Sequence, residues 1–435
     1  MRTWLSWWPI LMILAALPAA ARRLSLEEAI DLARSESFRL RAADQAVAAA
    51  AAEVRTARAE LLPTLEAVAT HVDYDGDVFY ARFITPTGVP DPTATPTDVG
   101  DFSSTQAAVL RLSQPLYAGG ALRSQVRARG LERRIAEEEL RRERSDLDYE
   151  VTEAYYGVLL AERAVEVVRQ SVRRSEETLE AVRRRRAAEE ALRVEVLAAE
   201  SHLAADRHRL AGAEGDLRFA RLALARLLAG VPADDLQLTD SLTAPPRQVG
   251  EEEAVRRALA GHPAVAGGKL RLSLAEELAV AARSRAKPKL ALEGYHGWID
   301  SETFFEGTTF GFDLKISIPF FRDAAAAGGE RARAAAGQKL AASRLEELSS
   351  TLELRARRAV REVEEAYGAV EVARSALDYQ REKRRVTASA FREQLATADQ
   401  LMAEDAALAE AELGLYGAQH RARLAEAELD RLAGG

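Results

Sequence analysis

Apolar residues recur at seven-residue spacing from Leu140 to Val182, interrupted at Ser175, and a shorter series of the same spacing occurs in the second half of the chain. A seam sustained over so many heptads is typical of a coiled coil. An ordinary helical bundle is the alternative, but its helices seldom reach roughly 63 Å, the length of the first series at ~1.5 Å per residue. We therefore predict a mainly α fold of long coiled-coil helices. The series are Leu140–Val182 and Val151–Leu179 in the first half, and Leu345–Ala373 and Ala356–Leu377 in the second.

Composition agrees with long helices and excludes several functions. Ala, Leu, Glu and Arg dominate, and aromatic residues make up only 6% of the chain, a mixture that favours helix. The net charge of −8 gives no general attraction to nucleic acid, so no nucleic-acid partner is expected. The chain has no cysteine, which rules out disulfides, thiolate zinc sites and a cysteine nucleophile.

The first 21 residues read as an export signal. Arg2 precedes the apolar stretch Leu5–Leu17, and Ala19–Ala21 offers a cleavage site for the signal peptidase. A retained membrane anchor is the alternative, but the stretch is shorter than the ~20 residues that span a bilayer. No later window is long and apolar enough, so no transmembrane helix is expected in the exported chain.

The remainder divides into two copies of one plan, predicted at 22–245 and 246–435. Val151–Tyr155 is echoed by Val363–Tyr367, and the first helical segment of each copy ends at a proline, Pro63 or Pro288. Each copy reads as a helix, a β-hairpin and two long helices. A period near half the chain indicates a duplication rather than a solenoid. We expect the copies, joined by a linker at 240–250, to form one intertwined domain.

Each copy contains one predicted β-hairpin, at 64–117 and 289–321. From Phe310 to Phe320, apolar residues alternate with polar ones, which predicts a strand with one apolar face. A long loop is expected at 85–101. In a soluble sandwich the apolar face would pack on a second sheet, whereas in an outer-membrane barrel it would face lipid. A sheet in lipid must close on itself, and four strands are too few, so the barrel requires several subunits.

Three further motifs occur in order along the chain: Leu112–Gly120, Val194–Glu200 and Phe391–Thr397. Together with the duplicated plan, they make the chain resemble the TolC family of outer-membrane efflux and secretion channels, over almost its whole exported length. The resemblance implies a homotrimer whose strands form a shared outer-membrane β-barrel, continued into the periplasm by an α-helical tunnel. It also implies a periplasmic adaptor and an inner-membrane pump, as in tripartite efflux or type I secretion, and no cofactor.

The same resemblance suggests where the periplasmic end lies. The family usually has glycine at each helical turn there, whereas this sequence has Glu189 and Gln394. Solvated charges on a helix face are the alternative for Asp399 and Glu404. The resemblance implies pore-entrance candidates at Glu195, Asp399, Gln400 and Glu404, and adaptor-contact candidates at Arg186, Glu189, Arg193, Gln394, Leu395 and Thr397.

Other motifs do not indicate enzymatic chemistry. The chain has no P-loop, no H-E-x-x-H and no nucleophile elbow, so no catalytic, cofactor or metal residues are predicted. We expect Gly119-Gly120 and Gly328-Gly329 to form strand-to-helix bends. Arg183–Arg186 is an adaptor patch or a solvated helix end. The main alternative to a channel is an exported coiled-coil scaffold without a pore. The sequence does not specify the cargo.

Overall fold

The structure, a computed structural model, describes residues 22–73, 104–229, 231–233, 236–243, 245, 247, 249–301 and 307–434. The predicted signal peptide and the loop at 85–101 lie outside these residues. The helices are α1 (Leu26–Glu36), α2 (Phe38–Ala59), α3 (Ala121–Ala187), α4 (Arg193–Leu227), α5 (Glu251–Gly261), α6 (Pro263–Ser284), α7 (Arg322–Arg392) and α8 (Ala398–Leu432). The strands are β1 (Arg22–Leu24), β2 (Thr64–Asp73), β3 (Ser104–Tyr117), β4 (Leu236–Leu238), β5 (Lys289–Ser301) and β6 (Gly307–Ser317).

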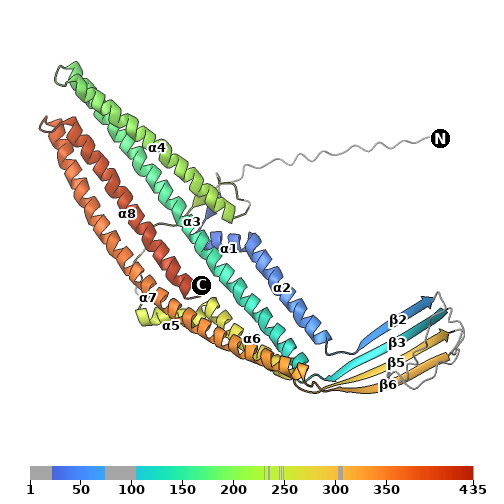
Figure 1. Cartoon of the computed structure of the whole chain (residues 1–435). Helices are drawn as coiled ribbons and strands as arrows, with labels where there is room; N and C mark the ends of the chain where they lie inside the picture. Colours follow the sequence, from blue (N-terminus) through green and yellow to red (C-terminus); the bar gives the residue numbers. More distant parts are fainter. Residues whose placement is uncertain are drawn as a thin grey trace, which may run out of the picture. The chain divides into compact units, whose positions relative to one another are not determined.

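Contacts divide the chain into two compact units. We call one the hairpin unit, drawn from Met1–Asp44, Glu138–Ala266 and Leu348–Gly435, and the other the sheet unit, drawn from Gln45–Glu137 and Gly267–Glu347. Each unit takes segments from both halves of the sequence. The four longest helices pair as two antiparallel hairpins, α3–α4 and α7–α8 (Figure 1). Among the described residues, no helix is both long and apolar enough to span a bilayer.

The order of elements repeats as the sequence predicts, with one correction. Two helices, two long strands and two long helices occur in each half, whereas a single opening helix was expected. The first break is at Ser37, which has an extended backbone and whose hydroxyl accepts from the Leu40 N–H. The second is at His262, which precedes Pro263, and a residue before proline is driven from the helical region.

The predicted coiled-coil seams are buried. Along α3 the valines at 151, 158, 165 and 172 are buried together with Leu147 and Val182, and along α7 the same holds for Leu352, Ala356, Val363 and Leu377. Helix α4 alone extends about 50 Å at ~1.5 Å per residue. The mainly α fold with a small sheet is therefore confirmed.

The two echoed tyrosines have the same task in each half. The hydroxyl of Tyr155 donates to the Leu24 carbonyl at 2.9 Å, and that of Tyr367 contacts the Pro245 carbonyl at 3.1 Å. Each tyrosine therefore holds the segment that leads into its own half of the chain. Burial raises the pKa of both hydroxyls to about 12, so both remain donors at physiological pH.

The sheet unit contains one antiparallel sheet in the order β2-β3-β5-β6. Strand β6 ends at Ser317, earlier than the predicted 321, because Pro319 has no N–H for the ladder. Gly119 and Gly120 have positive φ of 65° and 95° before α3, as expected for a bend. The prediction for Gly328-Gly329 was wrong. Both lie inside α7, and Phe321 carries the positive φ (46°) instead.

Candidate functional site

The first feature with functional potential is the two-faced sheet. Pairing in the ladder aligns Leu112 with Gly294 and Gly294 with Phe312, so these side chains share one face. The next row places Glu66, Arg111 and Tyr295 on the opposite face. Large apolar side chains on the first face are exposed in the single chain: Leu65, Leu110, Phe310, Phe312, Leu314 and Ile316.

Glycines let the aromatic side chains of this sheet lie flat against the neighbouring strand. A Cβ on Gly311 would be 2.6 Å from the Tyr295 ring, and one on Gly294 would be 2.8 Å from the Phe312 ring. Each glycine therefore receives the aromatic ring of the opposite strand, one ring on each face. Cross-strand contacts of this kind stabilise a sheet and fix its register.

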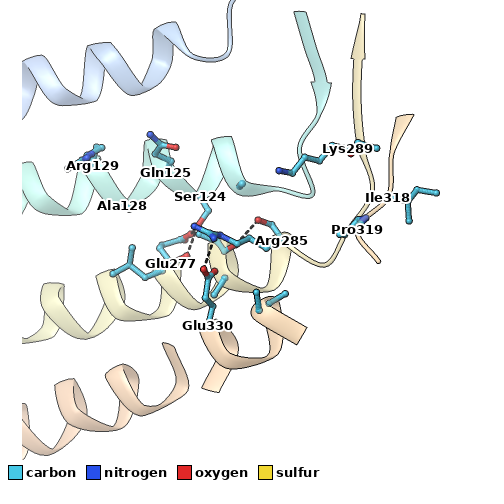
Figure 2. A pocket seen from close by; sticks show the side chains of 18 of the residues that line it. Ser124, Gln125, Ala128, Arg129, Glu277, Arg285, Lys289, Ile318, Pro319 and Glu330 are labelled. Atoms are coloured by element: carbon cyan, nitrogen blue, oxygen red, sulfur yellow. Dashed lines mark hydrogen bonds and ion pairs between the residues drawn. The ribbon is translucent and has the colours of Figure 1, made fainter. Parts of the chain in front are cut away.

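A groove of about 830 Å³ lies where the strands meet the helices of the sheet unit (Figure 2). The Ser124 hydroxyl lies 2.6 Å from the Glu277 carbonyl and 2.9 Å from its carboxylate, and Arg285 pairs with Glu330 at 2.5 Å. A hydrogen bond from Arg127 lowers the pKa of Glu277, so the carboxylate is charged. Within the groove these groups therefore satisfy one another as hydrogen-bond and ion-pair partners.

The two helical turns lie where the sequence places them. Glu189 and Gln394 have positive φ of 65° and 62°, the left-handed conformation that glycine usually provides. In the first turn, the Glu190 N–H donates to the Arg185 carbonyl at 2.8 Å, and the Glu189 N–H donates to the Arg186 carbonyl at 3.1 Å. The second turn has the same two bonds, which define a Schellman motif. The predicted position of both turns is confirmed.

Side chains connect the two turns to each other. The Gln394 amide donates to the Glu190 carboxylate at 3.2 Å. The Arg185 guanidinium donates to the Phe391 carbonyl and stacks 4.1 Å from the centre of the Phe391 ring. An apolar cluster behind the turns includes residues of all four long helices, among them Leu179, Leu203, Phe391 and Met402. The two turns of one chain therefore form a single packed end.

The pore-entrance candidates do not form one cluster. The carboxylate of Glu195 accepts from the Leu192 N–H at 2.9 Å and so caps α4. Gln400 and Thr397 form a capping box at the start of α8. Glu404 lies 2.9 Å from Lys383, whose hydrogen bond lowers the pKa of this carboxyl. Asp399 is exposed in the first turn of α8.

The adaptor-contact candidates all lie at the turns. Leu395 has 78% of its surface exposed, which is unusual for a leucine. Arg193 begins α4, and Arg186 donates to the Ala191 carbonyl at 3.2 Å. In the Arg183–Arg186 run, Arg183 pairs with Glu200 at 2.6 Å. Three of these four arginines are thus held by contacts within the chain, and Arg184 is exposed.

Heptad spacing also organises the charges of the α3–α4 hairpin. Ion pairs cross between the two helices at every seventh residue, forward along α3 and backward along α4. The side chains of three of the pairs are exposed, so each of these three contributes little stability by itself, whereas Glu162 and Arg221 are half-buried. The four pairs are Glu162–Arg221 (2.9 Å), Arg169–Glu214 (2.9 Å), Glu176–Arg207 (2.7 Å) and Arg183–Glu200 (2.6 Å).

The α7–α8 hairpin keeps this heptad ladder only in part. Tyr367 bonds Glu426 at 2.7 Å, and Arg381 lies 3.9 Å from Glu412. Seven residues after Arg381, nearest the turn, α7 has Ala388. Seven residues before Glu412, the corresponding residue of α8 is Asp405. The heptad series therefore provides no charged partner for Asp405 at position 388.

Asp405 instead belongs to a buried charged cluster, which the sequence did not reveal. Asp405 is only 4% exposed, accepts from Arg384 at 2.9 Å and lies 3.1 Å from Arg174 of α3. Its second oxygen has no hydrogen-bond partner among the described residues. Burial raises the pKa of Asp405, against the opposing effect of the two arginines. Nearby, Asp206 of α4 accepts from Ser171 at 3.2 Å and from Ser175 at 2.5 Å.

Comparison with known proteins shows what part of the chain resembles. Residues 29–230 match the outer membrane efflux protein family. Over 273 residues the chain is 26% identical to the cobalt-zinc-cadmium resistance protein CzcC of Cupriavidus metallidurans, which covers 63% of this chain. The chain spans 58% of the length of that relative.

Solved structures extend the likeness to the whole fold. The outer membrane protein VceC of Vibrio cholerae superposes with a TM-score of 0.81 at 19% identity, covering 94% of this chain and 96% of VceC. The CmeC outer membrane channel of Campylobacter jejuni gives 0.79 at 14% identity, covering 94% and 85%. The resemblance seen in the sequence is therefore confirmed. Residues 29–230 resemble the outer membrane efflux protein family, and the chain has the fold of these solved outer-membrane channels.

Proposed function

We propose that this chain is one subunit of a homotrimeric, passive efflux or secretion channel of the bacterial outer membrane that extends into the periplasm. The sheet is the observation that carries the proposal. Its edge strands β2 and β6 each pair on one side only among the described residues, and one face is apolar and exposed. Backbone groups in lipid must be paired. Pairing β6 of each copy with β2 of the next closes a barrel of twelve strands, within the range of known barrels.

The two faces of the sheet then receive distinct environments. The row of Phe310, Phe312 and Leu314 faces lipid, and the face with Glu66, Arg111 and Tyr295 lines a water-filled lumen. The long helices continue this lumen as a tunnel through the periplasm. The channel performs no covalent chemistry, and an inner-membrane pump supplies the energy.

The connected turns are the surface that meets a periplasmic adaptor. Leu192, Val194 and Leu395 are exposed apolar side chains at this end of the hairpin unit, and exposed apolar groups of this kind favour a protein partner. Asp399 adds exposed negative charge nearby and attracts cations to the entrance, whereas the charge of Glu404 is balanced by Lys383. Opening requires these turns to shift, and an adaptor that binds the open state better favours it.

Divalent cations are the first cargo to test, because the relative in Cupriavidus metallidurans is named for cobalt, zinc and cadmium resistance. The measurement is the growth of a deletion strain on these metals, with and without the restored gene. Unchanged sensitivity to metals, with increased sensitivity to organic toxicants, would redirect the cargo and leave the channel intact.

Two substitutions on adjacent residues of β6 test the channel itself. Phe312→Arg places a charge on the lipid face, which costs about 2–4 kcal/mol near the middle of a bilayer. Asp313→Arg places the same charge on the lumen face. We expect the first variant to be lost from the outer membrane and the second to insert as a trimer that migrates differently when unheated. A monomer that is soluble in plain buffer would instead support the scaffold without a pore.

A further inference from the structure

Within one chain, the two hairpins meet along an antiparallel seam between α3 and α8. Arg174 of α3 lies 3.1 Å from Asp405 of α8, and Arg163 of α3 lies 6.0 Å from the ring centre of Tyr416. Eleven residues forward on α3 thus correspond to eleven residues backward on α8. Val167, one heptad before Arg174 on α3, is 3% exposed, and Met402 and Ala409, which flank Asp405 by one helical turn on α8, are 4% and 5% exposed.

The duplication gives every residue of this seam an equivalent in the other hairpin. Positions are counted from the left-handed residue of each turn, Glu189 or Gln394. Val167 and Arg174 of α3 then correspond to Val372 and Tyr379 of α7, at the same distance before the turn. Met402 and Ala409 of α8 correspond to Leu197 and Ala204 of α4, at the same distance after it.

The equivalent residues are apolar but uncovered. Val372 is 71% exposed, Tyr379 is 66% exposed and Val386, one heptad further, is 53% exposed. On α4, Leu197 is 52% exposed and Ala204 is also exposed. Two stripes whose counterparts form a buried seam are therefore left open, one on each hairpin.

We infer that these two stripes are the surfaces that join neighbouring copies of this chain, with α7 of one copy packed antiparallel on α4 of the next. This rests on the proposed homotrimer and specifies its helical interface. Applying the α3–α8 register places Tyr379 at the level of Glu200 of the partner subunit. Its ring packs between Leu197 of the partner subunit and Ala204 of the partner subunit, which flank that level by one helical turn.

A second copy fits these stripes better than an unrelated protein. Val372, Tyr379 and Val386 recur at seven-residue spacing, the period that another helix of a coiled coil requires. The same chain already presents the matching helix face, with a large side chain on α7 opposite a small one on α4. One duplicated contact thus serves twice, once within the chain and once between chains.

Cysteine cross-linking tests this register directly, because the chain has no native cysteine. Tyr379→Cys is combined with Ala204→Cys in the full-length protein, which is oxidised in outer membranes and separated without reductant. We expect covalent dimers and trimers at about tenfold or more above either single variant. The matched control combines Tyr379→Cys with Leu222→Cys, an exposed residue of the same helix about 27 Å from Ala204 at ~1.5 Å per residue.

A second pair of introduced cysteines tests the same register if the first double variant fails to fold. Val386→Cys with Arg193→Cys occupies the next level of the proposed register and is expected to cross-link as well. The register is wrong, and the channel stands, if light scattering in detergent shows a trimer while neither pair cross-links and the Tyr379→Cys thiol reacts freely with a maleimide. A monomer by light scattering would contradict the homotrimer and this interface together.

Discussion

The α3–α4 and α7–α8 hairpins descend from one duplicated plan but hold their helices together differently. The first has four ion pairs across the hairpin at successive heptads, three of them exposed. The second has lost the pair nearest the turn, where Ala388 stands opposite Asp405. Asp405 is instead buried against Arg174 of the first hairpin.

This difference teaches that similar heptad patterns can support different kinds of stability. Exposed pairs are nearly independent, because solvent screens each of them. A buried charge depends strongly on its partners, because an unpaired charge away from water is costly. The first hairpin is therefore tolerant of single changes, and the second is tied to its neighbour through one sensitive contact.

The largest effect is expected from Arg174→Met. The change leaves buried Asp405 with Arg384 alone and lowers the free energy of unfolding by about 3 kcal/mol, as for other broken buried pairs. Urea unfolding of the detergent-solubilised protein, followed by circular dichroism at about 222 nm, measures it. Arg183→Met removes a pair from the first hairpin and serves as the control, with a loss of about 0.5 kcal/mol. Equal losses would contradict the comparison.

Acidification should reduce the difference in the free energy of unfolding between wild type and Arg174→Met. Burial raises the pKa of Asp405, so the folded state favours the protonated carboxyl. This stabilisation is complete below the unfolded pKa and is lost as the pH rises through the folded pKa. At low pH the neutral carboxyl no longer needs Arg174, and the gap between wild type and Arg174→Met narrows to about 1 kcal/mol. A gap that stays constant from about pH 7 to about pH 4 would show that Asp405 keeps its charge.

The turns provide an intermediate effect. Glu189→Gly relieves a left-handed backbone and stabilises the protein by about 0.5–1 kcal/mol, since the strain exceeds the entropy cost of glycine. Gln394→Gly relieves the same strain but removes the bond to Glu190, so its gain is smaller. Thermal melting of both variants in parallel tests the ranking. Equal gains would mean that the amide bond contributes nothing, and the opposite order would contradict the ranking.

The smallest effect on stability is expected from breaking an exposed ion pair in the middle of the α3–α4 hairpin. Arg169→Gln breaks the exposed pair with Glu214 and costs about 0.3–0.5 kcal/mol at low ionic strength. The loss should disappear in about 1 M salt, where the screening length is about 3 Å. A loss that persists at high salt would indicate packing by the arginine stem rather than charge.

Local signals in the sequence identified most of the fold. The heptad seams placed the buried valines of α3, and the turn positions followed from the resemblance to the TolC family. The exposed ladder was also within reach, because its charges recur at seven-residue spacing on both sides of a turn at Glu189. The two opening helices were harder, since the break at Ser37 depends on one capping bond.

The buried cluster was not accessible in the same way. Asp405 and Arg174 are far apart in the sequence, and an acidic residue in a charged helix resembles any solvated one. Its burial follows from the packing of α3 on α8, which no single heptad pattern specifies. Likewise, the side chains of Glu195 and Gln400 were expected near the entrance, and their capping bonds appear only once the start of each helix is fixed.

The two unmatched borders of the sheet bear on how such a molecule matures. Strands β2 and β6 each have one row of backbone groups without a ladder partner in the described chain, and apolar side chains cover one surface. A single copy can neither pair these backbone groups nor cover this apolar surface by itself. In the proposed trimer, final folding, association with sister copies and entry into the bilayer therefore become one concentration-dependent event.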